Sequence, residues 1–218
     1  MKYYIVGNGS YSKMLYRYLR STSDIEVKGF TVAEEFIKQN IIEGLPVVST
    51  NDLSEGDDLS EVRLLMGIGY RNMNKIKERE YNRYKTKGFS FDNYIHPTAI
   101  IEKNVVIGEA NNIFEGVIIQ EGVKIGNGNL IYGGSLIAHE SVIGDFNSVS
   151  VKSCIAGCTI IGNNCFIGAN STVRDHLTIA DYTLVGAGTY VASDTDEYNV
   201  VVTDKGRILE GKRSIDYI

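Results

Sequence analysis

The chain is poor in cysteine and histidine, with three of each among its 218 residues. The odd number of cysteines argues against a set of structural disulfides, so we expect Cys154, Cys158 and Cys165 to be free thiols in a reducing cytoplasm. Their spacings of four and seven residues match no usual ligand pattern, and we predict no metal site. Cys165 falls on an inward phase of the repeat described below and is expected to be a small core residue.

The sequence also lacks long apolar runs and an excess of positive charge. No apolar stretch approaches the length that spans a bilayer, so we predict no membrane segment. Residues 1–6 lead directly into an expected strand and do not resemble a signal peptide. The net charge of −5 gives no reason to expect a nucleic-acid partner. We therefore expect a cytoplasmic protein with one large domain or two small ones.

What the chain does contain is a six-residue repeat that runs from residue 95 to residue 191 without an insertion. A period of six fits neither an α-helix nor a plain strand, and it is typical of the hexapeptide repeat of a parallel β-helix. Three hexads make one coil of eighteen residues, and each aliphatic side chain points into a narrow prism. The repeated positions are Ile95, Ile101, Ile107, Ile113, Ile119, Ile125, Ile131, Ile137, Ile143, Val149, Ile155, Ile161, Ile167, Val173, Ile179, Val185 and Val191.

The residues before the repeat have the pattern of a small parallel α/β sheet. The charges of its last helix, Lys77 among them, are interpreted as a solvated face. We expect an α/β domain over residues 1–92, a β-helix over 93–192, and a tail over 193–218 that caps the open prism. Strands are predicted at 2–6, 25–30, 45–48 and 62–68, and helices after Ser10, over 33–39 and over 72–87.

The loop Gly7-Asn8-Gly9-Ser10 joins the first strand to the first helix. Such a turn presents backbone N–H groups at a helix N-terminus, where a phosphate binds, and Ser10 is a candidate N-cap. The third glycine of the dinucleotide fingerprint is missing, which favours a mononucleotide or sugar nucleotide over a dinucleotide. A tight turn without a ligand is the alternative. Thr31 stands where a ribose- or base-binding acid is expected, and Gly69 marks the carboxyl end of a strand, where ligands bind in open α/β sheets.

His139 is the histidine that the repeat singles out. It follows an inward aliphatic by two residues and points out of the prism, and Gly157, eighteen residues later, should stack one coil above it. An imidazole beside a bare backbone N–H can accept a proton and stabilise an oxyanion in acyl transfer, and Glu140 is a candidate to fix the ring's tautomer. A surface histidine on a structural solenoid is the alternative. His96 is interpreted as structural, and His176 as a surface residue.

Several of these segments together resemble the nucleotide-amino-sugar N-acetyltransferases. They are the Gly7-x-Gly9 turn, Gly69, Ile95-His96-Pro97 and the segment from His139 to Phe146. The resemblance covers residues 1 to about 192 and is most specific around His139. It implies a left-handed β-helix, acetyl-CoA as the co-substrate, and a homotrimer with active sites between neighbouring prisms. The family includes enzymes that act on bacillosamine, perosamine and other 4-amino-4,6-dideoxy sugars, with related sialic acid O-acetyltransferases.

The resemblance also implies roles for particular residues. By motif, His139 corresponds to the general base, Glu140 to its orienting acid and Gly157 to the oxyanion donor at the thioester carbonyl. Backbone at Gly186, Ala187 and Gly188 corresponds to the lining of the pantetheine arm. The implied nucleotide pocket comprises Gly7, Gly9, Ser10, Thr31, Gly69 and Arg71.

The chain departs from the family's pattern at several positions. Phe30-Thr31 replaces an acidic pair at the end of the second strand. Asn74, Tyr132 and Ser148 stand where an arginine, an asparagine and a second histidine are often found. The common Gly-x-Pro-Ala-Lys end is missing. The departures at Phe30-Thr31, Asn74 and Tyr132 leave the nucleotide and the sugar open, and the different end leaves open the contacts to the CoA phosphates.

The leading hypothesis is an acetyl-CoA-dependent N-acetyltransferase that acts on the 4-amino group of a dTDP-, UDP- or GDP-linked 4-amino-4,6-dideoxy sugar. The product would serve surface-glycan synthesis, for example the O-antigen of lipopolysaccharide. Two alternatives remain at this point. One is an O-acetyltransferase of a sugar such as sialic acid, and the other is a non-catalytic solenoid that binds sugar nucleotides.

Overall fold

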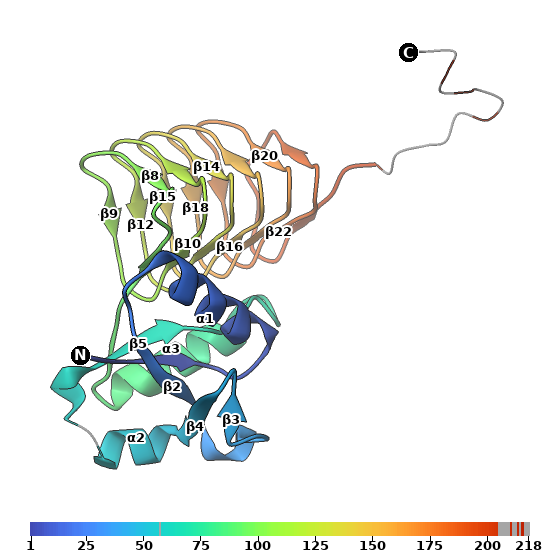
Figure 1. Ribbon diagram of the computed structural model, residues 1–218. Helices are drawn as coiled ribbons and strands as arrows, with labels where there is room; N and C mark the ends of the chain where they lie inside the picture. Colours follow the sequence, from blue (N-terminus) through green and yellow to red (C-terminus); the bar gives the residue numbers. More distant parts are fainter. Residues whose placement is uncertain (57, 205–209, 211–212, 214, 216–218) are drawn as a thin grey trace.

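The computed structural model describes residues 1–56, 58–204, 210, 213 and 215. An N-terminal α/β unit lies beside a prism of stacked coils (Figure 1). The elements of the α/β unit are β1 (Lys2–Val6), α1 (Ser10–Thr22), β2 (Val27–Val32), a 3₁₀ turn (Glu34–Phe36), β3 (Ile41–Ile42), β4 (Leu45–Ser49), α2 (Thr50–Gly56), a 3₁₀ turn (Leu59–Glu61), β5 (Val62–Met66), α3 (Lys75–Thr86) and β6 (Ser90–Phe91).

The N-terminal sheet has the strand order β3-β4-β2-β1-β5-β6. Strands β4, β2, β1, β5 and β6 run parallel, as the sequence predicted, but β3 pairs antiparallel with β4 and makes the sheet mixed. Both faces are covered, because Ile5 and Phe30 pack with α1 while Val6 and Leu64 pack with Tyr84 of α3. A sheet buried on both faces is typical of parallel α/β units and leaves the carboxyl ends of its strands as the accessible edge.

Two predictions about where helices begin and end in this unit were wrong. The helix expected over residues 33–39 is only the 3₁₀ turn Glu34–Phe36, because the chain turns almost at once into the β3–β4 hairpin. The N-cap of α1 is Gly9 rather than Ser10, which is the first helical residue. Gly9 has no capping side chain, and its own N–H donates to the Oγ of Ser12 at 3.0 Å.

The remaining strands form a left-handed parallel β-helix with three faces. Each strand up to residue 173 pairs with the strand eighteen residues later, so the predicted coil length is confirmed. The first face contains β7 (Tyr94–Ile95), β10 (Asn112–Ile113), β13 (Leu130–Ile131), β16 (Ser148–Val149), β19 (Phe166–Ile167), β22 (Leu184–Val185) and β24 (Val200–Val201). The second face contains β8 (Ile100–Ile101), β11 (Ile118–Ile119), β14 (Leu136–Ile137), β17 (Cys154–Ile155), β20 (Thr172–Val173) and β23 (Tyr190–Val191). The third face contains β9 (Val106–Ile107), β12 (Lys124–Ile125), β15 (Val142–Ile143), β18 (Ile160–Ile161) and β21 (Thr178–Ile179).

The repeated aliphatics form the core of the prism. From Ile113 to Val191 they are buried and contact one another in one cluster, which also contains Cys165. Ile95 is 42% exposed because it belongs to the open first coil. The residue after the aliphatic is often small, as at Gly126, for a steric reason: a Cβ on Gly126 would lie 2.9 Å from the backbone of the next coil. The burial of β-branched side chains therefore fixes the prism, and the small residues allow its sharp corners.

The prism continues past Val191 with one shortened coil. Strand β24 pairs with β22 at a spacing of sixteen residues instead of eighteen. Thr195 occupies the place of the missing strand, and its N–H donates to the carbonyl of Thr178 at 3.1 Å. The predicted capping tail begins in this coil, whereas its residues 205–209, 211–212, 214 and 216–218 lie outside the described part.

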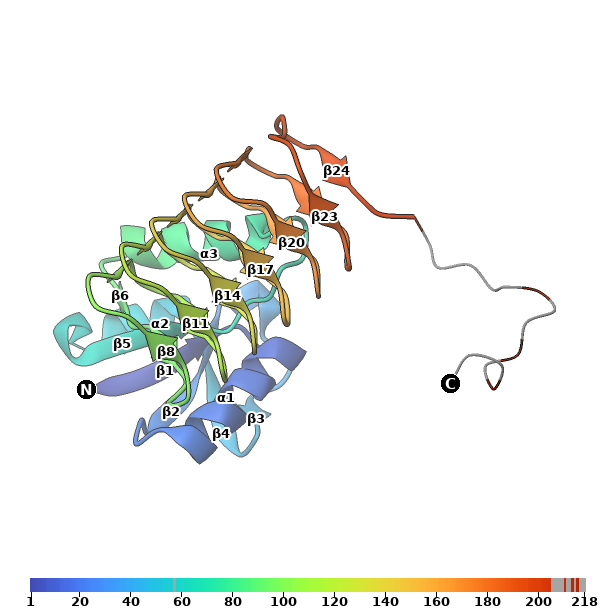
Figure 2. The same cartoon turned by 90° about the horizontal axis from the view of Figure 1, so that it is seen from above.

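The first face of the prism packs against the α/β unit, and α3 runs alongside the coils (Figure 2). Asn112 donates from Nδ2 to the carbonyl of Met66 at 2.7 Å. Asn74 accepts from the hydroxyl of Ser148 at 2.7 Å and donates to the carbonyl of Cys165 at 3.2 Å. These bonds anchor residues 72–74, which have three consecutive positive φ angles.

Lys77 corrects the prediction of a solvated face on the last helix. It is fully buried at the junction, and its Nζ donates to the carbonyl of Asn147 at 3.3 Å. Within the described residues it has no carboxylate partner, and burial holds its pKa well below the ordinary value. In the part of the chain that the structure describes, the α/β unit leaves the second and third faces of the prism free (Figure 1).

Candidate active site and nucleotide pocket

His139 lies on the corner between the second and third faces, formed in its coil by residues 138–141 and here called the second corner. The structure places its ring over Gly157, as the spacing of eighteen predicted. A Cβ added to Gly157 would lie 2.6 Å from both Cε1 and Nε2 of the imidazole. The His139 side chain is exposed, and its backbone N–H is held by the side-chain oxygen of Gln120 at 3.0 Å. The absence of a side chain at Gly157 therefore leaves the space that the His139 ring occupies.

Of the two backbone polar groups of Gly157, only the carbonyl has a hydrogen-bond partner among the described residues. Its carbonyl accepts from the N–H of His176 at 3.1 Å, but its own N–H has no hydrogen-bond partner among the described residues. The neighbouring N–H of Cys158 donates to the carbonyl of His139 at 2.9 Å and ties the two coils together at this corner. A free N–H beside a titratable ring is the pair of groups that an acyl transfer requires.

Glu140 does not contact the ring that it is expected to orient. Its carboxylate occupies the space beside Gly122, one coil before it, where an added Cβ would overlap it. The His139 ring lies toward Gly157, one coil after it, so the two side chains extend in opposite directions along the prism. In the part of the chain that the structure describes, no hydrogen bond joins them. The described residues therefore show no direct contact by which Glu140 would fix the tautomer of the His139 ring.

Other polar residues surround His139 that the sequence analysis did not single out. Glu102, Gln120 and Glu121 line a cavity of about 560 Å³ together with His139 and Glu140. Glu121 precedes His139 by eighteen residues, so the coil spacing that found Gly157 would have found it too. The described lining of this cavity is therefore acidic around a single histidine.

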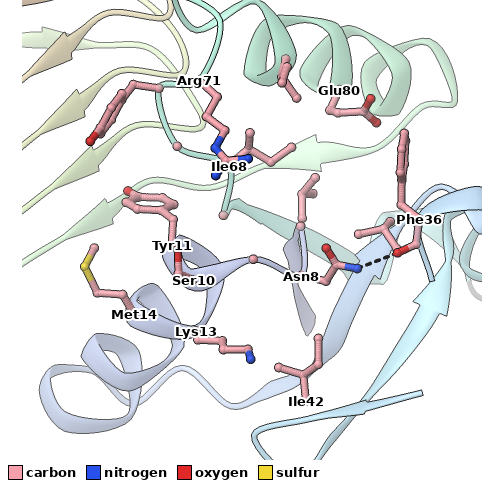
Figure 3. Close-up of a pocket in the computed structure, with 18 of the residues that line it drawn as sticks. Asn8, Ser10, Tyr11, Lys13, Met14, Phe36, Ile42, Ile68, Arg71 and Glu80 are labelled. Atoms are coloured by element: carbon pink, nitrogen blue, oxygen red, sulfur yellow. Dashed lines mark hydrogen bonds between the residues drawn. The ribbon is translucent and has the colours of Figure 1, made fainter. Parts of the chain in front are cut away.

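A second cavity, of about 990 Å³, lies at the carboxyl ends of β1, β2 and β5 (Figure 3). Five of the six residues predicted for the nucleotide pocket line it, namely Gly7, Gly9, Ser10, Gly69 and Arg71. The first turn of α1 starts at its edge, and the N–H groups of such a turn have no partner within the helix. Together with the helix dipole they favour an anion at this position.

Gly7 and Gly9 of the loop are glycines for different physical reasons. Gly7 has a φ of +107°, which L side chains rarely adopt, and an added Cβ would lie 3.0 Å from the carbonyl oxygen of Gly67. Gly9 has a negative φ and no atom within 4 Å of an added Cβ. Packing therefore requires glycine at position 7, whereas at position 9 the absent side chain only keeps the loop open to the cavity.

Thr31, the sixth predicted residue, does not line the cavity. It is fully buried, and its hydroxyl lies 3.1 Å from that of Tyr84. Successive side chains of a strand point to opposite faces, and at Thr31 the face is that of α3. The prediction placed the residue at the correct end of β2 but on the wrong side of the sheet.

Basic and aromatic residues complete the cavity. Lys13, Lys38 and Arg79 line it in addition to Arg71, and Tyr132 reaches it from the prism. Lys13 lies one turn into α1, a position that could have been inferred from the loop. Tyr132 stacks on Phe114 with ring centroids 5.3 Å apart. Neither this stacking nor the place of Tyr132 in the cavity could be predicted from the sequence.

One chain does not bring all the predicted site residues together. No described residue lines both cavities. Tyr132 belongs to the corner between the first and second faces, here called the first corner, which also carries Gly186, Ala187 and Gly188. The whole second face separates this corner from His139. Among the described residues, no group of three His, Cys, Asp or Glu side chains is placed to hold a metal ion.

Two family patterns match the repeat. The pattern described as bacterial transferase hexapeptide (six repeats) matches residues 158–193, and that of the hexapeptide repeat of succinyl-transferase matches residues 98–132. A variant of perosamine N-acetyltransferase from Caulobacter crescentus, solved with CoA and GDP-perosamine, aligns with a TM-score of 0.80 and 25% identity. That alignment covers 93% of this chain and 94% of the other. The chain is an acyltransferase with hexapeptide repeats. The predicted resemblance to the nucleotide-amino-sugar N-acetyltransferases is confirmed.

Two more distant structures share the fold. The acetyltransferase domain of PglB from Neisseria gonorrhoeae FA1090 aligns with a TM-score of 0.78 at 22% identity, over 95% of this chain and 99% of that one. WeeI from Acinetobacter baumannii AYE aligns with a TM-score of 0.81 at 19% identity, over 96% of this chain and all of that one. Comparison with curated protein sequences gives no match. None of the helices in the described residues has both the length and the apolar character needed to cross a bilayer.

Proposed function

We propose that this acyltransferase uses acetyl-CoA to acetylate the 4-amino group of a nucleotide-linked 4-amino-4,6-dideoxy sugar for surface-glycan synthesis in the cytoplasm. The observation that carries the proposal is the His139 ring held over Gly157 on an open corner, where the N–H of Gly157 has no hydrogen-bond partner among the described residues. The likeness to a perosamine N-acetyltransferase solved with CoA and GDP-perosamine supports the substrate class.

The proposed reaction is a direct transfer. The amine nitrogen attacks the thioester carbonyl carbon, a C–N bond forms, and the C–S bond then breaks. His139 accepts the proton that the nitrogen loses and returns it to the departing sulfur, so the products are the amide and free CoA thiol. General base catalysis of this kind contributes about 10²–10⁴-fold. The Gly157 N–H donates to the oxygen of the tetrahedral intermediate, where one such donor contributes about 10²–10³-fold.

The cavity of the α/β unit fits the nucleotide end of this substrate. The α1 N-terminus and the loop from Gly7 to Ser10 would hold the diphosphate, with Lys13 and Arg71 supplying positive charge. Tyr132 at the prism end of the cavity would lie nearest the sugar. Backbone at Gly186–Gly188 would line the pantetheine arm, and the exposed Gly188, where an added Cβ meets no atom within 4 Å, leaves room for it.

We infer that the working enzyme is a homotrimer. His139 and the nucleotide cavity lie on opposite sides of the second face, so a neighbouring prism docked there would supply the missing half of the site. The two free faces expose apolar side chains at Ile100, Ile118, Val142 and Ile160, which a neighbour would cover.

The proposal is tested by measuring CoA thiol release from acetyl-CoA with dTDP-, UDP- and GDP-linked sugars. Each 4-amino-4,6-dideoxy sugar is paired with its 4-hydroxy counterpart. We expect release with an amino sugar and little with its hydroxy partner. Release with the hydroxy sugar alone would replace the proposal with O-acetylation. No release with any sugar, and no binding of acetyl-CoA, would leave a non-catalytic solenoid.

A further inference from the structure

We infer that the nucleotide cavity selects a 2′-deoxyribonucleotide, so that the sugar is carried by a deoxynucleoside diphosphate such as dTDP rather than by UDP or GDP. The inference rests on the proposed function, because it assigns the nucleoside within the same cavity. It stands on the side chains at the end of β2, which form the wall where the pentose would lie.

In a βαβ unit of this kind, the ribose 2′-hydroxyl is held by an acidic residue at the end of the second strand. Strand β2 ends here at Val32, and Ala33 follows. Both line the cavity, and neither has a polar side-chain atom. Glu34 and Glu35, the next two residues, are exposed and do not line it, and Glu35 lies 3.6 Å from Arg83. The usual acceptor of the 2′-hydroxyl is therefore replaced by an apolar surface.

Glu80 is the one carboxylate among the described residues that line the cavity, and each of its two oxygens lies close to an arginine. Oε1 of Glu80 lies 2.8 Å from Arg79, and its Oε2 lies 3.5 Å from Arg83. Lys13 and Lys38 are hydrogen-bond donors only and cannot accept the proton of a hydroxyl group. A 2′-hydroxyl placed against the side chains of Val32 and Ala33 would find no acceptor in them.

Two amides in the cavity do not change this conclusion. Asn8 donates its Nδ2 to the carbonyl of Phe36 at 2.8 Å, which leaves one oxygen that the 3′-hydroxyl, common to both kinds of pentose, can use (Figure 3). Gln39 is exposed at the rim, where water competes for its hydrogen bonds. Phe36 is 43% exposed and, with Ile42, gives this end of the cavity an apolar surface on which a base can stack.

The test compares UDP with 2′-deoxyuridine diphosphate, which differ only in the 2′-hydroxyl, by calorimetric titration of the wild-type protein. Burying a hydroxyl without a partner is unfavourable, so we expect the deoxynucleotide to bind about tenfold more tightly. Equal affinities, or tighter binding of UDP, would overturn the inference while leaving the nucleotide-sugar proposal intact. Binding of neither nucleotide would instead overturn the assignment of the cavity as a nucleotide site.

A pair of variants locates the effect. Ala33→Asp supplies an acceptor at an N-cap position that favours aspartate, and it should bring the affinity ratio of the two nucleotides to one or below. Ala33→Leu adds bulk without an acceptor and should keep the wild-type ratio. Both variants are checked for folding by thermal melting. An unchanged ratio in a folded Ala33→Asp protein would contradict the placement of the pentose at the end of β2.

Discussion

Replacing Gly157 with alanine puts a methyl group in the space that the His139 ring occupies. The added carbon would lie 2.6 Å from Cε1 and Nε2, whereas ordinary contacts begin near 3.4 Å. The ring must therefore move by roughly 1 Å, and a displacement of that size costs about 10²-fold in rate. The backbone N–H survives the substitution, so the loss reports the position of the base and leaves the oxyanion donor in place.

The expected effect is confined to catalysis. Gly157 does not have a positive φ, so alanine fits its backbone and should slightly stabilise the chain through the unfolded state. In steady-state assays of CoA thiol release we expect kcat to fall about 10²-fold, which corresponds to about 2.7 kcal/mol of transition-state stabilisation. The melting temperature should stay within a few degrees of wild type.

A double-mutant cycle separates this reasoning from a general disturbance of the corner. In a His139→Ala background the methyl group meets no ring, so adding Gly157→Ala should change the residual rate little. The matched control is Cys158→Ala, which alters the adjacent side chain without filling the space and should keep near-wild-type turnover. A Gly157→Ala enzyme with wild-type kcat, or additive losses in the double mutant, would refute the account of the ring.

Three further predictions concern the junction and the cavity. Lys77→Met should raise the free energy of unfolding at pH 7 by about 1–3 kcal/mol, because it removes a buried amine that must be neutralised on folding. The pKa of Lys77 is lower in the folded chain than in the unfolded chain, so between these two pKa values the unfolded chain binds more protons. Denaturant titrations should therefore show that the stability advantage of the variant shrinks as the pH rises toward the ordinary lysine pKa of 10.5. Ser148→Ala should lower the free energy of unfolding by about 1–3 kcal/mol, since it leaves the buried Asn74 oxygen without a donor, and an unchanged denaturation midpoint would contradict the role of that bond. Lys13→Ala should raise the KM for the nucleotide sugar but not for acetyl-CoA, whereas the exposed Arg17→Ala on the same helix should change neither.

The prism and the position of its histidine could be predicted because both depend on spacing alone. One hexapeptide phase assigns every inward aliphatic, and a coil of eighteen residues is enough to put Gly157 beside His139. The spacing of eighteen no longer predicts the pairing where the repeat ends, because the coil after Val191 is two residues shorter and β24 pairs with β22 at a spacing of sixteen.

The junction between the two parts of the chain could not be predicted, because it depends on contacts between residues far apart in the sequence. Lys77 has the pattern of a surface residue in its helix and is buried only because the prism covers it. Asn74 and Ser148, two departures from the family's pattern, meet at this junction. Thr31 was assigned to the cavity from its place in β2, but the strand turns that side chain toward Tyr84.

The central claim is that acetyl transfer takes place over His139 and Gly157. Its most direct test is CoA thiol release by wild type and His139→Asn, measured side by side with one nucleotide-linked 4-amino sugar. Asparagine keeps a polar group of similar reach but cannot accept a proton at neutral pH. We predict that kcat falls by about 10²–10⁴-fold while the melting temperature and the assembly mass remain those of wild type. Turnover near the wild-type rate would contradict the assignment of His139 as the base.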